Sequence, residues 1–83
     1  MGAMHLFLQQ APVGGAPPRF VRISLQPELF GGWLLLRESG EVGGRTTLRR
    51  EHHPDQPSAI AALDAISASQ RKRGFEPVDV LPA

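Results

Sequence analysis

Arginine is the residue type of this sequence that is best suited to bind a ligand. All but one of the nine basic residues are arginine, and the planar guanidinium can hold phosphate or carboxylate through two parallel hydrogen bonds. A local patch of such residues can follow a nucleic-acid backbone. The candidate nucleic-acid-binding residues are Arg37, Arg45, Arg49 and Arg50 on expected strands, and Arg71, Lys72 and Arg73 at the end of an expected helix.

Each basic group also has a structural explanation, and a GC-rich coding genome is a further reason for a high arginine content. Cations in the last turn of a helix favour the negative end of its macrodipole by about 0.3–1 kcal/mol each. Arginines on an exposed sheet face can pair across strands with Glu38, Glu41 and Glu51, for less than about 1 kcal/mol per pair. The formal net charge is only +1, so any basic binding surface must be local.

Patterns for catalysis and for metal binding are weak. The chain has no cysteine, which excludes disulfides, thiolate zinc sites and cysteine nucleophiles. It contains no Gly-x-Ser-x-Gly elbow, phosphate-binding loop or zinc-hydrolase signature. His52 and His53 are adjacent, so on a strand they point to opposite faces, and no third ligand has a supportive spacing. We therefore expect no enzyme, no metal or other cofactor, and no small-molecule substrate.

Length and composition indicate one small domain. A chain of 83 residues with 41% hydrophobic residues supports a single thin core. No apolar segment approaches the roughly 20 residues of a membrane span, and the N-terminus lacks the pattern of a signal peptide. We expect a soluble cytoplasmic protein that does not interact with membranes.

Alternation of apolar and polar residues predicts several strands. Within residues 20–26, Val21, Ile23 and Leu25 should face the core, while Arg22 and Ser24 face solvent. The continuous run of residues 34–36 predicts a strand buried on both faces in the middle of the sheet, and we expect Trp33 at its start to pack rather than to stack on a ligand. The expected strands are residues 4–10, 20–26, 33–39, 45–52 and 75–81.

The glycine-rich segment of residues 40–44 predicts a tight turn that joins residues 33–39 and 45–52 into a hairpin. The second of these strands is polar, which is typical of a sheet edge. Arg49 and Arg50 must point to opposite faces of the sheet. A single partner can therefore contact only the side chains on one of the two faces. If Arg37, Arg45 and the row of Arg49 share a face, they form a shallow basic patch.

One helix is expected over residues 58–70. Asp55 is a suitable N-cap, Pro57 is tolerated in the first turn, and Gly74 ends the segment. Ile60, Leu63 and Ile66 form a narrow apolar stripe that can lie on the sheet. The fold class that we predict is α+β, a mainly antiparallel sheet with one long helix packed on it.

Residues 20–78 resemble the WGR domain that accompanies poly(ADP-ribose) polymerases and also occurs in bacterial proteins. We expect a strand and a Pro/Gly-rich connection over residues 1–18, followed by the WGR-like domain over residues 19–81. The resemblance rests on the order of the elements and on Arg19-Phe20, Phe30-Gly31-Gly32-Trp33, Arg37-Glu38, Gly40, Gly43 and Arg71-Lys72-Arg73-Gly74-Phe75.

The signature of that family is Trp-Gly-Arg, whereas this chain has Ser39, Gly40 and Glu41 at the matching place. In the polymerases the tryptophan packs against the sugar at a DNA end and the arginine helps join DNA to neighbouring domains. Ser39 cannot stack, and Glu41 would repel phosphate. The resemblance therefore implies the fold and a DNA-binding function, but not DNA-end binding in the manner of the polymerases.

The sequence leaves two functions open for this chain. The first is a non-catalytic module that binds nucleic acid, above all DNA, weakly through its arginine-bearing strands and the end of its helix. The alternative is a protein-interaction or structural subunit, including a homodimer that pairs exposed strand edges or covers an apolar patch.

Overall fold

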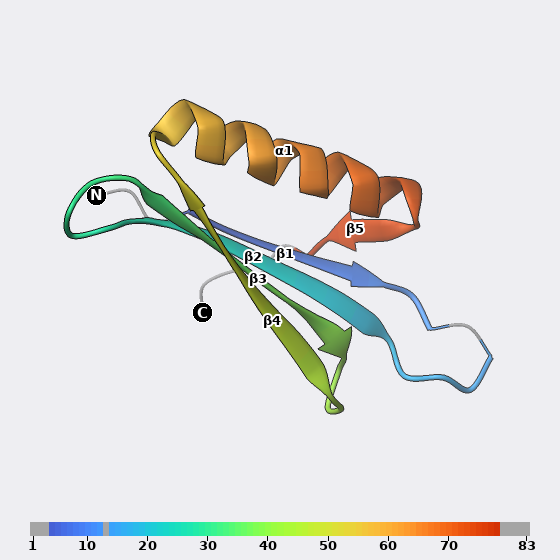
Figure 1. The fold of residues 1–83 in the computed structure, drawn as a ribbon. Helices are drawn as coiled ribbons and strands as arrows, with labels where there is room; N and C mark the ends of the chain where they lie inside the picture. The colour runs from blue at the N-terminus through green and yellow to red at the C-terminus, as the bar shows by residue number, and fades with distance from the viewer. Residues whose placement is uncertain (1–3, 13, 79–83) are drawn as a thin grey trace, which may run out of the picture.

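A five-stranded antiparallel sheet with one helix across it makes up the fold (Figure 1). The computed structural model describes residues 4–12 and 14–78. Along the sheet the strand order is β4-β3-β2-β1-β5. The predicted α+β class is confirmed. The elements are β1 (Met4–Gln10), β2 (Arg19–Pro27), β3 (Trp33–Glu41), β4 (Thr46–His53), α1 (Gln56–Lys72) and β5 (Phe75–Pro77).

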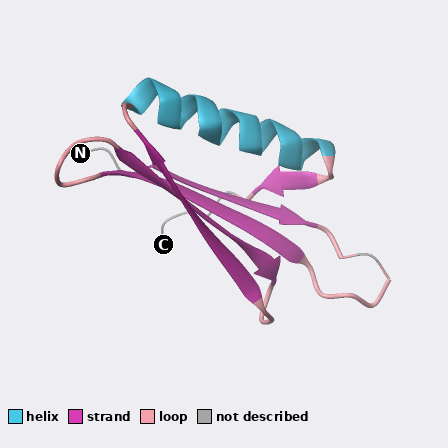
Figure 2. Cartoon of the chain, viewed as in Figure 1, coloured by secondary structure: helices cyan, strands magenta, loops and turns pink. Residues whose placement is uncertain are grey.

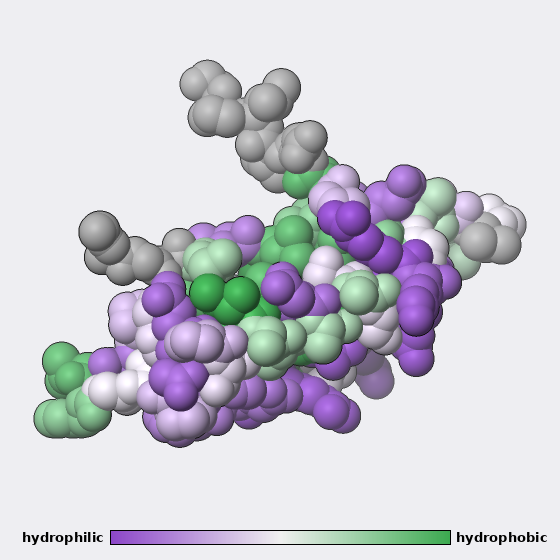
Figure 3. All heavy atoms as spheres, turned by 90° about the horizontal axis from the view of Figure 1, so that it is seen from above, coloured by the Kyte–Doolittle hydropathy of each residue, from purple (hydrophilic) through white to green (hydrophobic). Residues whose placement is uncertain are grey.

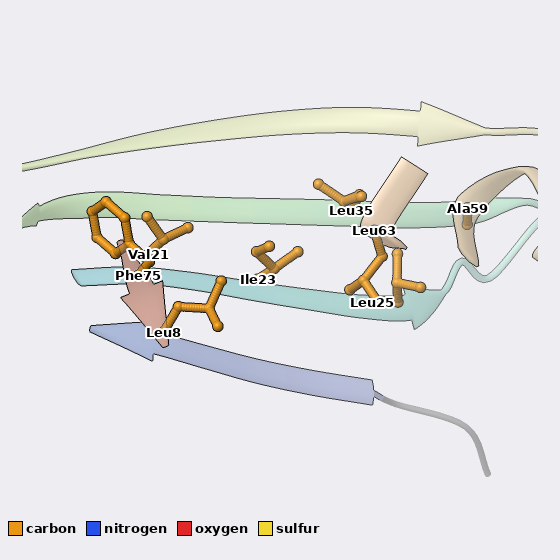
Figure 4. Packing of buried hydrophobic residues seen from close by; sticks show 8 residues of the cluster. All are labelled: Leu8, Val21, Ile23, Leu25, Leu35, Ala59, Leu63 and Phe75. Atoms are coloured by element: carbon orange, nitrogen blue, oxygen red, sulfur yellow. The ribbon is translucent and has the colours of Figure 1, made fainter. Parts of the chain in front are cut away.

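The core lies between α1 and one face of the sheet (Figures 1 and 2). Figure 4 shows apolar side chains of β1, β2 and β3 pointing to this layer, where those of α1 and β5 meet them. The predicted alternation along β2 is confirmed, because its apolar row is buried and Arg22 is exposed on the other face. Trp33 packs against the core, as predicted. The core cluster comprises Leu8, Val21, Ile23, Leu25, Leu35, Ala59, Leu63 and Phe75.

The predicted burial of β3 on both faces is wrong. Only Leu35 of the leucine run is buried, while Leu34 and Leu36 are half-buried and alternate with it toward the opposite face. In the part of the chain that the structure describes, no helix or strand covers that face. The middle strand is β2, and β3 is second from the edge. A single helix can cover only one face of a sheet, which the leucine run alone does not reveal.

The two ends of the sheet agree with the predictions. β3 and β4 form the expected hairpin, and β4 is an edge strand with mostly exposed side chains. β5 forms the other edge by pairing with β1, so β1 is an internal strand with fully buried Leu8. The predicted last strand, residues 75–81, is shorter than expected, and its residues 79–81 lie outside the described residues.

Both ends of α1 are stabilised by caps. The Ser58 backbone N–H donates a hydrogen bond of 2.9 Å to Asp55 Oδ1, which confirms the predicted N-cap. Gly74 has a left-handed φ of 93° just after the helix, a conformation that favours glycine. The Gln10 amide then donates a hydrogen bond of 2.7 Å to the Arg73 carbonyl oxygen. The end of the helix is therefore held against β1.

The Asp55 cap predicts a stability difference that depends on pH. Hydrogen bonds from the backbone and the side chain of Ser58, with a smaller contribution from His53, lower the pKa of the Asp55 carboxyl, and desolvation opposes them. A lowered pKa in the folded state means that the stabilisation is present above the pKa of the unfolded chain. It is lost as the pH falls through the folded pKa. Asp55→Ala should lower the melting temperature by a few degrees at pH 7.

Thermal melts followed by circular dichroism between pH 7 and pH 2 measure this effect. The difference between Asp55→Ala and the unchanged protein should vanish at the acidic end. Asp64→Ala removes an equal charge from an exposed position within α1 and is the matched control. If the two variants melt alike at pH 7, the cap does not stabilise α1.

Candidate nucleic-acid interface

Arg37 and Arg49 lie directly opposite each other on β3 and β4. Arg37 continues the row of Leu35, so both arginines point to the side of the sheet that carries α1. Ser39 and Thr47 form the next pair of the same register. These four side chains line a hollow of about 290 Å³. The structure therefore brings two of the sequence-predicted arginines together.

A second hollow of about 100 Å³ continues the first toward the end of α1, and the two share Arg37 and Ser39. β2 contributes Arg19, while Gln70 and Arg73 come from the last turn and the C-cap of the helix. Viewed from the helix side, hydrophilic atoms gather at the right of the molecule, where α1 ends (Figure 3). The polar side chains of the two hollows define what we call the arginine groove: Arg19, Arg37, Ser39, Thr47, Arg49, Gln70 and Arg73.

Within the described residues, no carboxylate forms an ion pair with the arginines of the arginine groove. No aspartate or glutamate lines either hollow. Among Arg and Lys side chains, the one ion pair within the described residues joins Arg22 to Glu38, at 3.3 Å. Like charges placed directly opposite each other on a sheet destabilise it, and such local costs are typical of functional sites.

The structural alternative for the strand arginines was pairing with glutamates across strands. Within the described residues, Glu38 pairs with Arg22 and Glu51 pairs with His53, at 3.0 Å. Glu41 has no ion-pair partner there. The expected pairs with Arg37, Arg45 and Arg49 are therefore not formed by this part of the chain.

Gln70 brings a side-chain amide to the groove. Its residue is 4% exposed, and its side chain makes no hydrogen bond to another described residue. No side-chain polar atom of the described residues is both fully buried and without a hydrogen-bond partner, so the Gln70 amide is not an orphaned buried group. The amide offers both a donor and an acceptor to a ligand in the groove.

The remaining candidates do not join the arginine groove. Arg50 pairs with Leu36 and so lies on the opposite face of the sheet. Arg45 precedes β4 and lines neither hollow, so a basic patch that it would share with Arg37 and Arg49 stays a hypothesis. Arg71 and Lys72 are exposed in the last turn of α1, where they suit the helix macrodipole.

Sequence reasoning missed Arg19 and Gln70. Arg19 alternates with the buried Val21 on β2, so its side of the sheet was readable from the strand period. Gln70 follows Leu63 by two helical turns and continues the apolar stripe of α1. In both cases the periodicity predicts that the residue lies on the core-facing side of its element. A polar residue at the end of an apolar row is not recognised as part of that row by residue type alone.

The three signature positions separate into different environments. Ser39 lines the arginine groove, whereas Glu41 lines a different hollow. Gly40 lies so close to the start of β4 that a Cβ atom there would be 2.1 Å from the Arg45 carbonyl oxygen and 2.8 Å from Thr46 Cα. The glycine is therefore required by the hairpin itself, whatever the ligand.

Gly40→Ala should destabilise the protein by about 3 kcal/mol, at the upper end of overpacking costs, because two backbone segments must separate. Gly43→Ala is the control: its φ of 79° is left-handed, but nothing lies within 4 Å of a Cβ atom there. That strain alone costs about 1 kcal/mol. Urea denaturation gives both values, and equal losses would contradict the close approach at Gly40.

The described residues give little support for a metal site or a membrane-spanning helix. His52 contacts Glu28, and His53 pairs with Glu51. Over residues 4–12 and 14–78, no group of three or more potential metal ligands gathers. The single helix in these ranges is neither long nor apolar enough to cross a membrane.

Comparison with known proteins finds a distant relative. The chain is 31% identical over 78 residues to an uncharacterized protein, y4dW, of Sinorhizobium fredii. The match covers 94% of this chain but 38% of the relative, so the chain spans less than half of that protein. No protein-family model matches the chain, and no solved structure matches it. The WGR resemblance therefore stays a prediction.

Proposed function

We propose that this chain is a cytoplasmic, non-catalytic module that binds nucleic acid, DNA above all, by holding phosphates in the arginine groove. The supporting observation is that four arginines converge on one corner of the sheet while no described carboxylate lies within 4.0 Å of any of them. A guanidinium group can bind phosphate in a bidentate manner, through two parallel hydrogen bonds. The four arginines are Arg19, Arg37, Arg49 and Arg73.

The shape of the groove favours a chain of phosphates over a single small ligand. Arg37 and Ser39 line both hollows, so the arginines form a continuous row from β4 to the end of α1. The Ser39 and Thr47 hydroxyls and the Gln70 amide are groups that commonly contact phosphate and sugar. With Ser39 in place of a stacking tryptophan, we propose contact along the backbone and no selection of DNA ends.

Fluorescence-anisotropy titration of a labelled duplex at several salt concentrations tests this proposal. If each of the four arginines neutralises one phosphate, log K should fall against log salt with a slope of about −3.6. Blunt, 5′-phosphorylated and hairpin-closed ends should bind alike. Absent binding, or an affinity that does not change with salt, would contradict the proposal.

The second candidate is a protein-interaction subunit or homodimer, and two observations favour it. The outer edge of β4 is unpaired within the described residues, and Leu29 and Phe30 are 88% and 95% exposed at the β2–β3 turn. Against edge pairing, Arg49 and Arg50 occupy the centre of β4, and charged edge residues oppose such association. Light scattering on the titrated sample decides: a stable dimer that binds no DNA would favour this candidate.

A further inference from the structure

The outer edge of β4 has no neighbouring strand among the described residues (Figure 1). On its inner side β4 pairs with β3 along its whole length. At the turn the Glu41 backbone N–H donates a hydrogen bond of 3.3 Å to the Arg45 carbonyl oxygen, and the bonds of an antiparallel pair alternate from there. Every second residue of β4 therefore turns its backbone N–H and C=O groups outward: Thr46, Leu48, Arg50 and His52.

Positive charge flanks this edge on both faces of the sheet. Arg49 and Arg50 are consecutive and exposed at the centre of β4, so one side chain points to each face. The residue opposite Arg49 on β3 is Arg37, and the residue opposite Arg50 is Leu36. The one carboxylate of β4, that of Glu51, pairs with a histidine of the same strand. Neither Arg49 nor Arg50 therefore has an ion-pair partner among the described residues.

A second copy of this chain is a poor partner for the edge. Two β4 strands that join antiparallel in one continuous sheet place opposite each other residues whose side chains share a face. In the two such registers with the greatest overlap, either Arg49 or Arg50 lies directly opposite its own counterpart. Like charges in this position destabilise a sheet, and charged edges are a common protection against self-association. A partner of opposite charge fits the edge instead.

We propose that the outer edge of β4 binds an extended acidic segment of another protein as an added strand. Addition of a strand to a sheet edge is a known mode of peptide recognition, in which backbone hydrogen bonds give affinity and side chains give specificity. Two consecutive acidic residues of the segment lie opposite Arg49 and Arg50, one on each face. An apolar residue next to them lies opposite Leu48, which is 55% exposed.

The test uses the isotope-labelled protein and a peptide with blocked ends, Thr-Val-Thr-Glu-Glu-Val-Thr-Val, whose glutamates can face Arg49 and Arg50. At saturation the peptide should slow amide hydrogen exchange about tenfold or more at the outward N–H groups, such as those of Leu48 and Arg50. The inward N–H groups already bond to β3 and should change little. A control peptide with proline in place of the first two valines keeps the charge but loses two backbone donors, and it should give no protection.

Exchange of charges between protein and peptide tests the role of the two arginines. Arg49→Glu combined with Arg50→Glu should lower the affinity for the Glu-Glu peptide about tenfold and raise the affinity for the same peptide with Lys-Lys. Arg71→Glu combined with Lys72→Glu makes an equal change of charge in the last turn of α1 and should leave both affinities nearly unchanged. Thermal melts of both double variants show whether they are folded.

Three results would overturn the proposal. The first is equal binding of the proline peptide, which would mean attraction by charge alone. The second is unchanged exchange at the outward N–H groups of β4. The third is protection of these groups in concentrated protein without peptide, which would mean that a second copy occupies the edge. Arg49 also lines the arginine groove, but the peptide titrations contain no nucleic acid, so their outcome does not depend on the proposed function.

Discussion

Replacing Arg37 and Arg49 together by alanine is expected to weaken nucleic-acid binding at least about 100-fold near physiological salt. The two side chains lie opposite each other in the arginine groove, and a hydrogen bond to a charged group contributes about 1.5–3 kcal/mol. The salt slope should also decrease by about 2, one for each lost phosphate contact. Folding should not suffer, because the double substitution removes a repulsion between like charges.

Anisotropy titration and thermal melting of the same samples measure both effects. Arg50→Ala combined with Arg71→Ala is the matched control, because it removes equal charge from positions outside the groove. The control should lose only the small affinity that general attraction supplies. If both double variants lose affinity equally, binding depends on net charge and the arginine groove is not the site.

Ile23→Ala should remove much of the free energy of unfolding at 25 °C. Ile23 is fully buried at the middle of β2, the central strand of the sheet. Removing the buried part of such a side chain costs about 2–5 kcal/mol. A domain of this size has a thin core and a total stability near the lower end of the usual range, about 5 kcal/mol. The substitution is therefore expected to remove much or all of the free energy of unfolding.

Urea denaturation followed by circular dichroism measures the free energy of unfolding. Ser24→Ala changes the next residue of β2, which points to the uncovered face, and should alter stability by less than about 0.5 kcal/mol. An Ile23→Ala variant as stable as Ser24→Ala would mean that the core between β2 and α1 does not hold the fold together.

Elements with local signals were predicted well from the sequence. The Asp55 cap, the alternation along β2 and the polar character of β4 each depend on neighbouring residues only, and each is confirmed. Burial of residues 34–36 depends on how many layers cover the sheet, which is not a local property. The prediction failed there because one face of β3 has no covering element among the described residues.

The candidate site was predictable only in part. Strand periodicity left open whether Arg37 and Arg49 share a face, and the register shows that they lie opposite each other. The sequence does not show where α1 ends relative to these two arginines, because that depends on the tertiary arrangement. In the structure, the end of α1 brings Gln70 to the same hollow as Arg19 and Arg37. Glu41 lies opposite Arg19 in the register of β2 and β3 but lines a different hollow from Ser39, and the sequence did not reveal this placement.

Nuclear magnetic resonance offers the most direct test of the claim that phosphates bind in the arginine groove. The isotope-labelled protein is titrated with a short duplex, and shifts of arginine Nε–H and glutamine side-chain amide signals are followed. We expect the largest changes at Arg37, Arg49 and Arg73 and at the Gln70 amide, with Arg50 nearly unchanged. Changes confined to Arg50, Arg71 and Lys72, or no changes at saturating duplex, would contradict the claim.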